Sequence, residues 1–160
     1  MRKRRIGERV LSPRIPESAR QTKITVRDFC ESLAEFSEEY LRGALTFTCD
    51  GTSDGYIVAC SYQCSYAIRM AVEHGAPDKS VQISARVADG KFSLHIVIKD
   101  DVELEALAQI ARALRRAGFA VTPYTYGLMA ETKIERDKLL KIYAKSRKTF
   151  IQDLYTIFFM

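Results

Sequence analysis

The stretch RMAVEHGAPDKSVQISARVADGKFSLHIVIKDD, residues 69–101, decides the fold of this chain. It begins as the end of a helix, turns at a Gly-Ala-Pro sequence, and continues as two runs, residues 80–87 and 92–98, in which apolar and polar side chains alternate. The pair Asp89 and Gly90 lies between the runs, and Asp-Gly flanked by alternating residues is a strong hairpin signal. We therefore expect a helix followed by two long antiparallel strands.

The segments on both sides of this stretch repeat the same kinds of pattern. Apolar residues recur at three- and four-residue steps in the expected helices and at two-residue steps in the expected strands. The expected strands are residues 23–26, 44–50, 56–60, 80–87, 92–98, 119–124 and 127–134, and the expected helices are residues 26–42, 60–74, 101–117 and 135–160. The order is β-α-β-β-α-β-β-α-β-β-α. It predicts an α/β two-layer sandwich, with a mixed, mainly antiparallel sheet covered on one face by helices.

The expected helices have buried faces that can be named. In the helix over 26–42 the apolar residues at helical spacing are Phe29, Leu33, Phe36, Tyr40 and Leu41, and the outer face is acidic. In the helix over 101–117 the inward residues are Leu104, Leu107, Ala108, Ala111 and Leu114. In the last helix they are Leu139, Ile142, Tyr143, Phe150, Leu154 and Ile157. The chain ends in the apolar sequence LYTIFFM, which a monomer rarely leaves in water. This end either folds back over the open face of the sheet or forms a subunit contact.

Composition and length indicate one folded unit with a basic arm. The 160 residues are 47% hydrophobic and 28% charged, which is typical of a folded protein. We divide the chain into a basic arm or linker over 1–22, the folded body over 23–134, and a C-terminal amphipathic helix over 135–160. No apolar run reaches the roughly eighteen residues of a membrane span, and the N-terminus lacks the apolar segment of a signal peptide, so we expect a cytoplasmic protein.

Charge is unevenly distributed along the chain. Residues 1–20 hold seven Lys or Arg against two Glu, whereas residues 21–132 hold eleven against fifteen acids. The first residues include four adjacent cations, Arg2, Lys3, Arg4 and Arg5. Such a cluster can neutralise several phosphates of a nucleic acid, or can simply be a solvated linker.

The cysteines and tyrosines are candidates for ligand sites with a structural alternative. Cys30, Cys49, Cys60 and Cys64 form no CxxC pair, and we interpret them as reduced, mostly buried thiols. Cys60 and Cys64 are four residues apart on a helix, but no third metal ligand accompanies them, so we expect core packing and no metal. Four tyrosines form either a stacking surface or, as we expect, part of the core: Tyr62, Tyr66, Tyr124 and Tyr126.

The element order and the segment from KITVRDFCESLAEF to MAETKI, about 110 residues, resemble the ATP-binding domain of histidine kinases and the wider GHKL ATPase superfamily, whose fold is the Bergerat fold. In that family a helix carries an Asn that holds the magnesium of the nucleotide. Here the matching position is Met70, and a thioether does not ligate the hard Mg²⁺ ion. One turn earlier, where hydrolysing members often keep a carboxylate, the chain has Tyr66.

The family's Asp-x-Gly-x-Gly motif corresponds to the sequence DDVEL. The resemblance implies that Asp100 stands at the position that reads the adenine amino group, although an Asp-Asp pair here can instead cap the next helix. Val102 and Leu104 occupy the glycine positions, where side chains would intrude on a nucleotide. The family's glycine-rich lid is missing. Glu73 and His74, at the end of the preceding helix, are candidates for the phosphate region or are merely solvated.

The resemblance implies the fold and argues against the activity. We expect a catalytically silent histidine-kinase-like ATPase domain, a pseudoenzyme, that acts as a regulatory or protein-interaction module in bacterial signal transduction, with no catalytic residue, no metal and no bound ATP or Mg²⁺. Its partner is then another protein or a second copy of the chain. Two alternatives stay open: an active nucleotide-binding domain that uses Asp100 and Glu73, and a nucleic-acid-binding protein that uses its basic ends.

Overall fold

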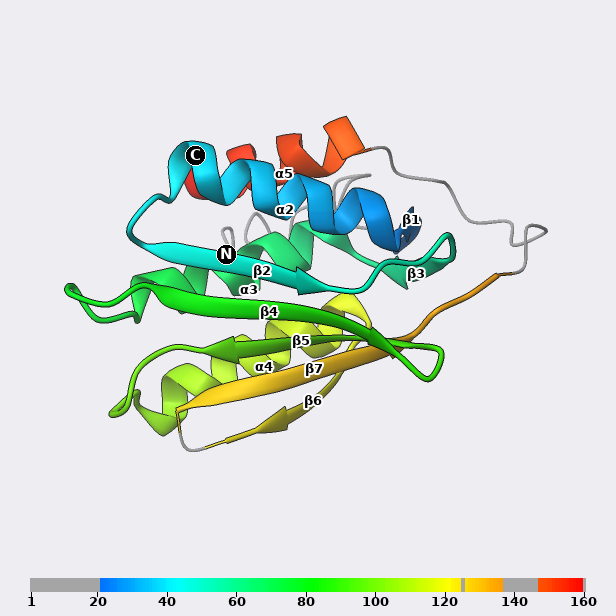
Figure 1. Cartoon of the computed structure of the whole chain (residues 1–160). Helices are drawn as coiled ribbons and strands as arrows, with labels where there is room; N and C mark the ends of the chain where they lie inside the picture. The colour runs from blue at the N-terminus through cyan, green and yellow to red at the C-terminus, as the bar shows by residue number, and fades with distance from the viewer. Residues whose placement is uncertain (1–20, 125, 137–146, 160) are drawn as a thin grey trace, which may run out of the picture.

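The structure is a computed structural model, and it describes residues 21–124, 126–136 and 147–159 (Figure 1). The strands are β1 (Thr22–Thr25), β2 (Leu45–Asp50), β3 (Tyr56–Ala59), β4 (Val81–Ala88), β5 (Lys91–Val97), β6 (Ala120–Pro123) and β7 (Gly127–Lys133). The helices are α2 (Val26–Tyr40), α3 (Ser61–Glu73), α4 (Leu104–Ala117) and α5 (Arg147–Phe159). Their order along the described residues is the one that the sequence predicts.

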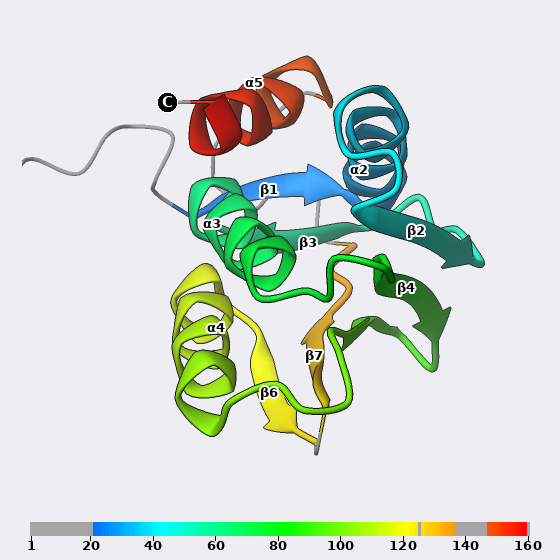
Figure 2. The ribbon, with the colours of Figure 1, turned by 90° about the vertical axis from the view of Figure 1, so that its left-hand side faces the viewer.

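Five strands form the main sheet in the order β2-β4-β5-β7-β6. Strands β2 and β4 are parallel, and the other three pairs are antiparallel. The helices lie on one side of this sheet, which leaves the other face open (Figure 2). The expected α/β two-layer sandwich with a mixed, mainly antiparallel sheet is confirmed.

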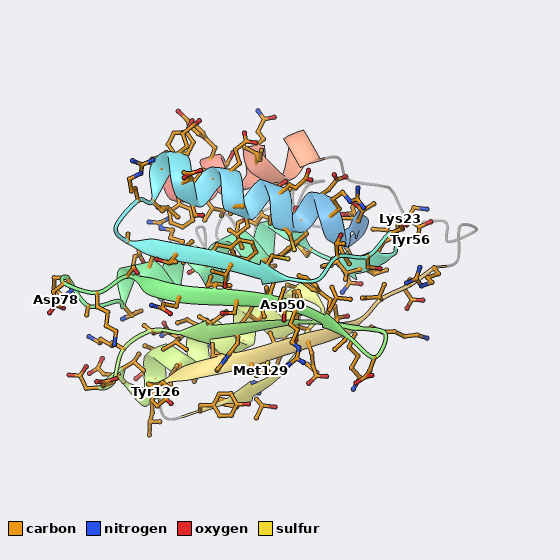
Figure 3. The ribbon with its side chains drawn as sticks, in the orientation of Figure 1. Lys23, Asp50, Tyr56, Asp78, Tyr126 and Met129 are labelled. Carbon is orange, nitrogen blue, oxygen red and sulfur yellow. The ribbon has the colours of Figure 1, made fainter. Side chains whose placement is uncertain are left out.

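Strands β1 and β3 form a separate antiparallel pair, with Thr22 opposite Ala59 and Thr25 opposite Tyr56. The segment after β7 is bonded to β3, because Tyr56 and Glu135 exchange two backbone hydrogen bonds of 2.9 and 2.6 Å. The Lys23 ammonium lies 4.8 Å from the centre of the Tyr56 ring (Figure 3). This small sheet supports the helices rather than extending the main sheet.

Helix α2 begins at a side-chain cap and buries one face. The Thr25 hydroxyl accepts a hydrogen bond of 3.0 Å from the Asp28 backbone N–H, which satisfies one of the donors that a helix leaves unpaired at its start. Phe29, Leu33 and Phe36 follow at helical spacing and are completely buried. The helix therefore packs by the periodicity that its sequence shows.

The hairpin between β4 and β5 turns at the Asp-Gly pair. Asp89 and Gly90 have φ angles of 55° and 75°. Positive φ at both central residues is what a two-residue hairpin turn of type I′ requires, and Asp and Gly tolerate it best. The turn fixes the register that places Ile83 opposite Ile96 and Ala85 opposite Leu94, side chains that are buried beneath the helices.

Aromatic rings link α5 to the centre of the core. Phe150 stacks on Phe29 with ring centres 4.9 Å apart, and Phe29 meets Phe92 of the main sheet edge to face at 5.3 Å. Helix α5 packs against α2 and α3 on the helical side of the molecule. Of the two alternatives for the apolar end, folding over the open face of the sheet is therefore wrong, because the rings of α2 offer it an apolar surface and the open face is largely polar; the subunit contact stays a prediction.

Two polar contacts fix α5 further. The Ser61 hydroxyl at the start of α3 donates a hydrogen bond to the buried carboxylate of Asp153, and the Arg69 guanidinium donates one of 2.9 Å to the Ile157 carbonyl. Phe150 and Leu154 are completely buried, as expected. The inward positions expected at Leu139, Ile142 and Tyr143 lie outside the described residues.

Helix α4 buries a face that only partly agrees with the expectation. Leu107, Ala111 and Leu114 are in the core, but Ala108 is exposed and Leu104 is 81% exposed. Leu104 is the first residue of the helix, and it lines a pocket with His95 and Tyr124 instead of joining the core. The division into 1–22, 23–134 and 135–160 stays a prediction, with the core shared by α5 and the body.

Candidate functional site

Met70 lies on the buried face of α3, one turn before the end of the helix. Its side chain is 7% exposed and belongs to the same apolar core as Ile68 and Ala71. Helix α3 packs here against α4 and α5. The residue that the sequence resemblance matches with the magnesium-binding Asn is thus part of the apolar core.

The other candidates on α3 lie at the surface. Tyr66 is 44% exposed, contrary to the expectation that it fills the core. Glu73 is exposed and accepts a hydrogen bond of 3.1 Å from Arg69, its neighbour one turn earlier. His74 is the C-cap residue, and its backbone N–H bonds to the Met70 carbonyl at 3.1 Å. Glu73 therefore forms an ion pair on the helix surface.

The connection from β5 to α4 carries the second group of candidates. Asp100 is exposed in a turn, whereas Val102, two residues later, is 6% exposed and belongs to the core. The N-cap residue of α4 is Glu103, without a side-chain capping bond. The alternative that the Asp-Asp pair caps this helix is therefore wrong, and Asp100 is left as a solvent-facing carboxylate.

The structure brings these two groups to the same end of the molecule. The connection after α3 and the connection before α4 both lie at the left in Figure 1. Met70 and Val102 nevertheless point into the core between the elements. Three pockets are lined by described residues, and Met70, Val102, Asp100, Glu73 and His74 line none of them, whereas Leu104, at the second expected glycine position, lines one.

The open face of the main sheet carries one of these pockets. Asp50 and Met129 lie on this face, and Tyr126 at its lower edge (Figure 3). The pocket is lined by His95, Leu104, Pro123, Tyr124 and Tyr126. Tyr124 and Tyr126 are 44% and 45% exposed, so their expected place in the core is wrong. They lie on the connection between β6 and β7 at the edge of the main sheet, where no second layer covers them.

A cluster of exposed aromatic rings joins the ends of α2 and α5. Tyr40, Tyr155 and Phe159 are 42%, 49% and 52% exposed. Their ring centres are 5.9 Å (Tyr40 to Tyr155), 5.4 Å (Tyr40 to Phe159) and 5.1 Å (Tyr155 to Phe159) apart. A hydrogen bond with Glu39 raises the pKa of the Tyr40 hydroxyl. We call Tyr40, Tyr155 and Phe159 the aromatic cluster.

Cys60 and Cys64 are buried thiols that form no disulfide, as expected. Cys60 is the N-cap residue of α3, and burial raises the pKa of Cys64 to about 12. Among the described residues no group of three or more His, Cys, Asp or Glu side chains is arranged to hold a metal ion. Both thiols therefore act as packing and capping residues.

The sequence did not reveal the proximity of the other two cysteines. Cys30 of α2 is 8% exposed, and Cys49 near the end of β2 is exposed, although a buried position was expected. Their sulfur atoms are 3.2 Å apart. The sequence does indicate the side on which each thiol lies, because Cys49 alternates with Leu45 and Phe47 along β2 and Cys30 follows buried Phe29. That α2 packs on β2, which brings the two thiols together, is known only from the structure.

The remaining candidates are outside the part of the chain that is described. The cationic positions Arg2, Lys3, Arg4 and Arg5 belong to residues 1–20. Across the described helices, none has the length and apolar character needed to span a membrane.

Comparison with solved structures returns ATP-binding and catalytic domains of histidine kinases. The histidine kinase AdeS of Acinetobacter baumannii is 11% identical, with a TM-score of 0.48 over 80% of this chain and 72% of that chain. The ATP-binding domain of PrrB from Mycobacterium tuberculosis is 15% identical, with a TM-score of 0.45 over 74% and 98%. The catalytic domain of the histidine kinase ThkA is 11% identical, with a TM-score of 0.44 over 71% and 95%.

These are the same kind of domain that the sequence resemblance indicated. No protein-family model and no curated protein sequence matches the chain. At such identities the similarity is one of fold, and the chemistry of the site has to be judged from the residues of this chain.

Proposed function

We propose that this chain is a histidine-kinase-like domain that has exchanged nucleotide chemistry for a regulatory, protein-binding role in bacterial signalling. The observation that carries the proposal is the burial of Met70 and Val102. Both occupy positions where the resembled family handles the nucleotide, and both are core residues here, 7% and 6% exposed.

The residues at these positions do not fit magnesium or a triphosphate. Mg²⁺ binds oxygen ligands in octahedral geometry, and the Met70 side chain offers one soft sulfur within apolar packing. A nucleotide also needs backbone that it can approach closely, which the family obtains from glycine, whereas the Val102 side chain fills that place. Binding would require both side chains to leave the core, at a cost of about 1.5–3 kcal/mol each.

The residues that remain do not compensate. Asp100 is exposed on a turn, and Glu73 is paired with Arg69 at 3.1 Å. An exposed carboxylate on a turn lacks the enclosed, mostly apolar surroundings of ordinary ligand sites. These observations disfavour the alternative of an active domain with altered motifs.

A titration with ATP and Mg²⁺ tests the proposal. A ligand at about 100 times its Kd stabilises the folded state by about 2.7 kcal/mol, which raises the Tm of a domain of this size by roughly 5–10 °C. We expect no change in Tm at millimolar Mg-ATP and no heat in calorimetry. Binding at micromolar strength would overturn the proposal, and loss of that binding in Asp100→Asn would then establish the active alternative.

The aromatic cluster is the surface that we propose for the partner. Three partly exposed rings in mutual contact form an apolar patch of the kind that protein interfaces use. Glu38 and Glu39 of α2 are exposed beside Tyr40. An acidic border favours a partner that brings apolar groups together with Lys or Arg, and it disfavours a second copy of the same acidic surface.

A pair of designed amphipathic peptides can test this assignment. The two peptides share a leucine face, and the polar face is Lys in one and Glu in the other. We expect the Lys peptide to bind in a salt-dependent manner, and Tyr155→Ser/Phe159→Ser to remove the binding. The matched control is Tyr124→Ser/Tyr126→Ser, which removes two exposed rings outside the aromatic cluster, on the connection between β6 and β7. Equal binding of both peptides would refute the role of the acidic border. A dimer seen by light scattering that becomes monomeric in Tyr155→Ser/Phe159→Ser would refute it as well.

A further inference from the structure

Cys30 and Cys49 form a thiol pair that no part of the proposed function uses. Cys30 projects from α2 and Cys49 from the edge strand β2, 19 positions later, and both thiols are free. Their sulfur atoms are 3.2 Å apart. A disulfide bond is about 2.05 Å long, so the sulfurs need to approach by little more than 1 Å, roughly the scale of a side-chain rotation.

A pocket gives solvent access to the pair. It has a volume of about 440 Å³ and lies between α2 and β2, with Cys30, Cys49, Arg27, Glu31 and Phe47 in its lining. Cys49 is exposed at this pocket, whereas Cys30 is 8% exposed. A small oxidant in this pocket therefore meets the exposed Cys49 more readily than the mostly buried Cys30.

Burial and the neighbouring Cys49 thiol raise the pKa of Cys30 well above its ordinary range. A thiol reacts with an oxidant as the thiolate, so Cys30 is the poorer first nucleophile. The Cys49 hydrogen is directed at the Cys30 sulfur or at the Gly51 carbonyl oxygen, 3.3 Å away. The two cysteines therefore differ in role: an accessible one that reacts first and a sheltered one that resolves.

We propose that Cys30 and Cys49 are a reversible redox site that hydroperoxides oxidise to a disulfide joining α2 to β2. The Cys49 thiolate attacks the distal oxygen of the hydroperoxide, the S–O bond forms, the O–O bond breaks, and the alcohol leaves with a proton from solvent. The Cys30 sulfur then attacks the Cys49 sulfenic acid, the S–S bond forms, and the hydroxyl leaves as water with the Cys30 proton. The two thiols lose two electrons and the hydroperoxide gains them.

The bond would constrain the helix that carries Tyr40 of the aromatic cluster. It closes the chain between residues 30 and 49, and a loop of that length is expected to raise the Tm by roughly 5–10 °C. Thiol reductants reverse the bond, since the pair is open to the pocket. The site does not depend on whether the domain binds a nucleotide.

The experiment treats the reduced, full chain with a stoichiometric hydroperoxide and measures intact mass, peptide mass and Tm. We expect a loss of about two mass units with no added oxygen, because disulfide formation removes two hydrogens. Trypsin releases Cys30 in peptide 28–42 and Cys49 in peptide 43–69, and these are expected as one linked species without reductant. The Tm rise should disappear on addition of dithiothreitol.

Peptide 43–69 also holds Cys60 and Cys64, so the control variant Cys60→Ser/Cys64→Ala is treated in parallel. It should form the same disulfide to the same extent. Cys49→Ser, a change at an exposed position, should form none. In Cys30→Ser the sulfenic acid of Cys49 should persist and react with a dimedone probe.

Two outcomes would overturn the proposal. One is that the Cys60→Ser/Cys64→Ala variant keeps its full mass under oxidation and so forms no disulfide. The linked peptides of the wild type would then be joined through Cys60 or Cys64. The other is direct addition of oxygen atoms to the wild type without peptide linkage, since the two sulfurs would then fail to meet.

Discussion

Replacing Met70 with Asn restores the side chain that the resembled family uses for magnesium, and it should damage the fold without creating a site. Met70 is 7% exposed in the core of α3. Loss of its burial costs about 1.5–3 kcal/mol, and an amide placed in apolar packing without partners costs about 1–3 kcal/mol more. We expect Met70→Asn to lower the free energy of unfolding by about 4 kcal/mol and the Tm by roughly 10 °C.

The assay is urea denaturation followed by circular dichroism, with and without millimolar Mg-ATP. Tyr66→Asn is the matched control, because it places the same amide on the same helix one turn earlier at a position that is 44% exposed. It should cost less than about 1 kcal/mol. Two results would refute the reasoning: a Met70→Asn variant as stable as the control, or one whose denaturation midpoint rises with Mg-ATP.

Three further predictions concern the packing. Asp153→Ala should lower the free energy of unfolding by about 2–4 kcal/mol, because alanine leaves the Ser61 hydroxyl without its buried acceptor. Asp153→Asn should lower it by less, and urea denaturation measures both. Because of Cys64, the free energy of unfolding should fall above pH 9 by about 1.4 kcal/mol per pH unit. The folded thiol stays protonated to a pKa of about 12, whereas the unfolded thiol ionises near 9.0. Cys64→Ala should reduce the slope by this amount in thermal melts at pH 8–10, while the contribution of Cys30, whose pKa is also raised, remains. Gly127→Ala should sharply reduce the amount of soluble, folded protein, because a Cβ there would overlap the Ile96 carbonyl oxygen and separate β5 from β7. Size-exclusion chromatography measures this amount, and an unchanged elution profile would contradict the close approach of these strands.

Local sequence signals predicted the elements well. The Asp89-Gly90 turn acts where the sequence placed it, because positive φ is a property of a few adjacent residues. The alternation in β4 and β5 likewise fixed which side chains are buried. Element order, fold class and the burial of Cys60 and Cys64 could therefore be obtained without coordinates.

Features that depend on which elements meet could not be obtained in this way. Leu104 has the correct helical phase to be buried but is the first residue of the helix and lines a pocket. Tyr124 and Tyr126 have rings large enough to fill a core, but they lie on the connection between β6 and β7 and stay partly exposed. The distance between Cys30 and Cys49 depends on how α2 lies on β2, which no local pattern encodes.

The candidate site was partly predictable. The sequence identified Met70 and Val102 as departures from the motif, and the structure adds that both serve the core. For Asp100, Glu73 and His74 a role in nucleotide binding stays a prediction. Solvent exposure and ion pairing depend on neighbours such as Arg69, whose pairing with Glu73 is an ordinary helix contact at a four-residue spacing.

The two sheets are interleaved along the chain. Strand β1 pairs with β3, and β2, which lies between them in sequence, pairs with β4 beyond them. A growing or cut chain therefore cannot complete one sheet before it contains part of the other, and no fragment that stops short of β4 has both pairs. Non-local pairings of this kind slow folding and couple the parts into one transition. The domain should melt as a single unit, and separately expressed halves, divided between β2 and β3, should gain structure only when mixed.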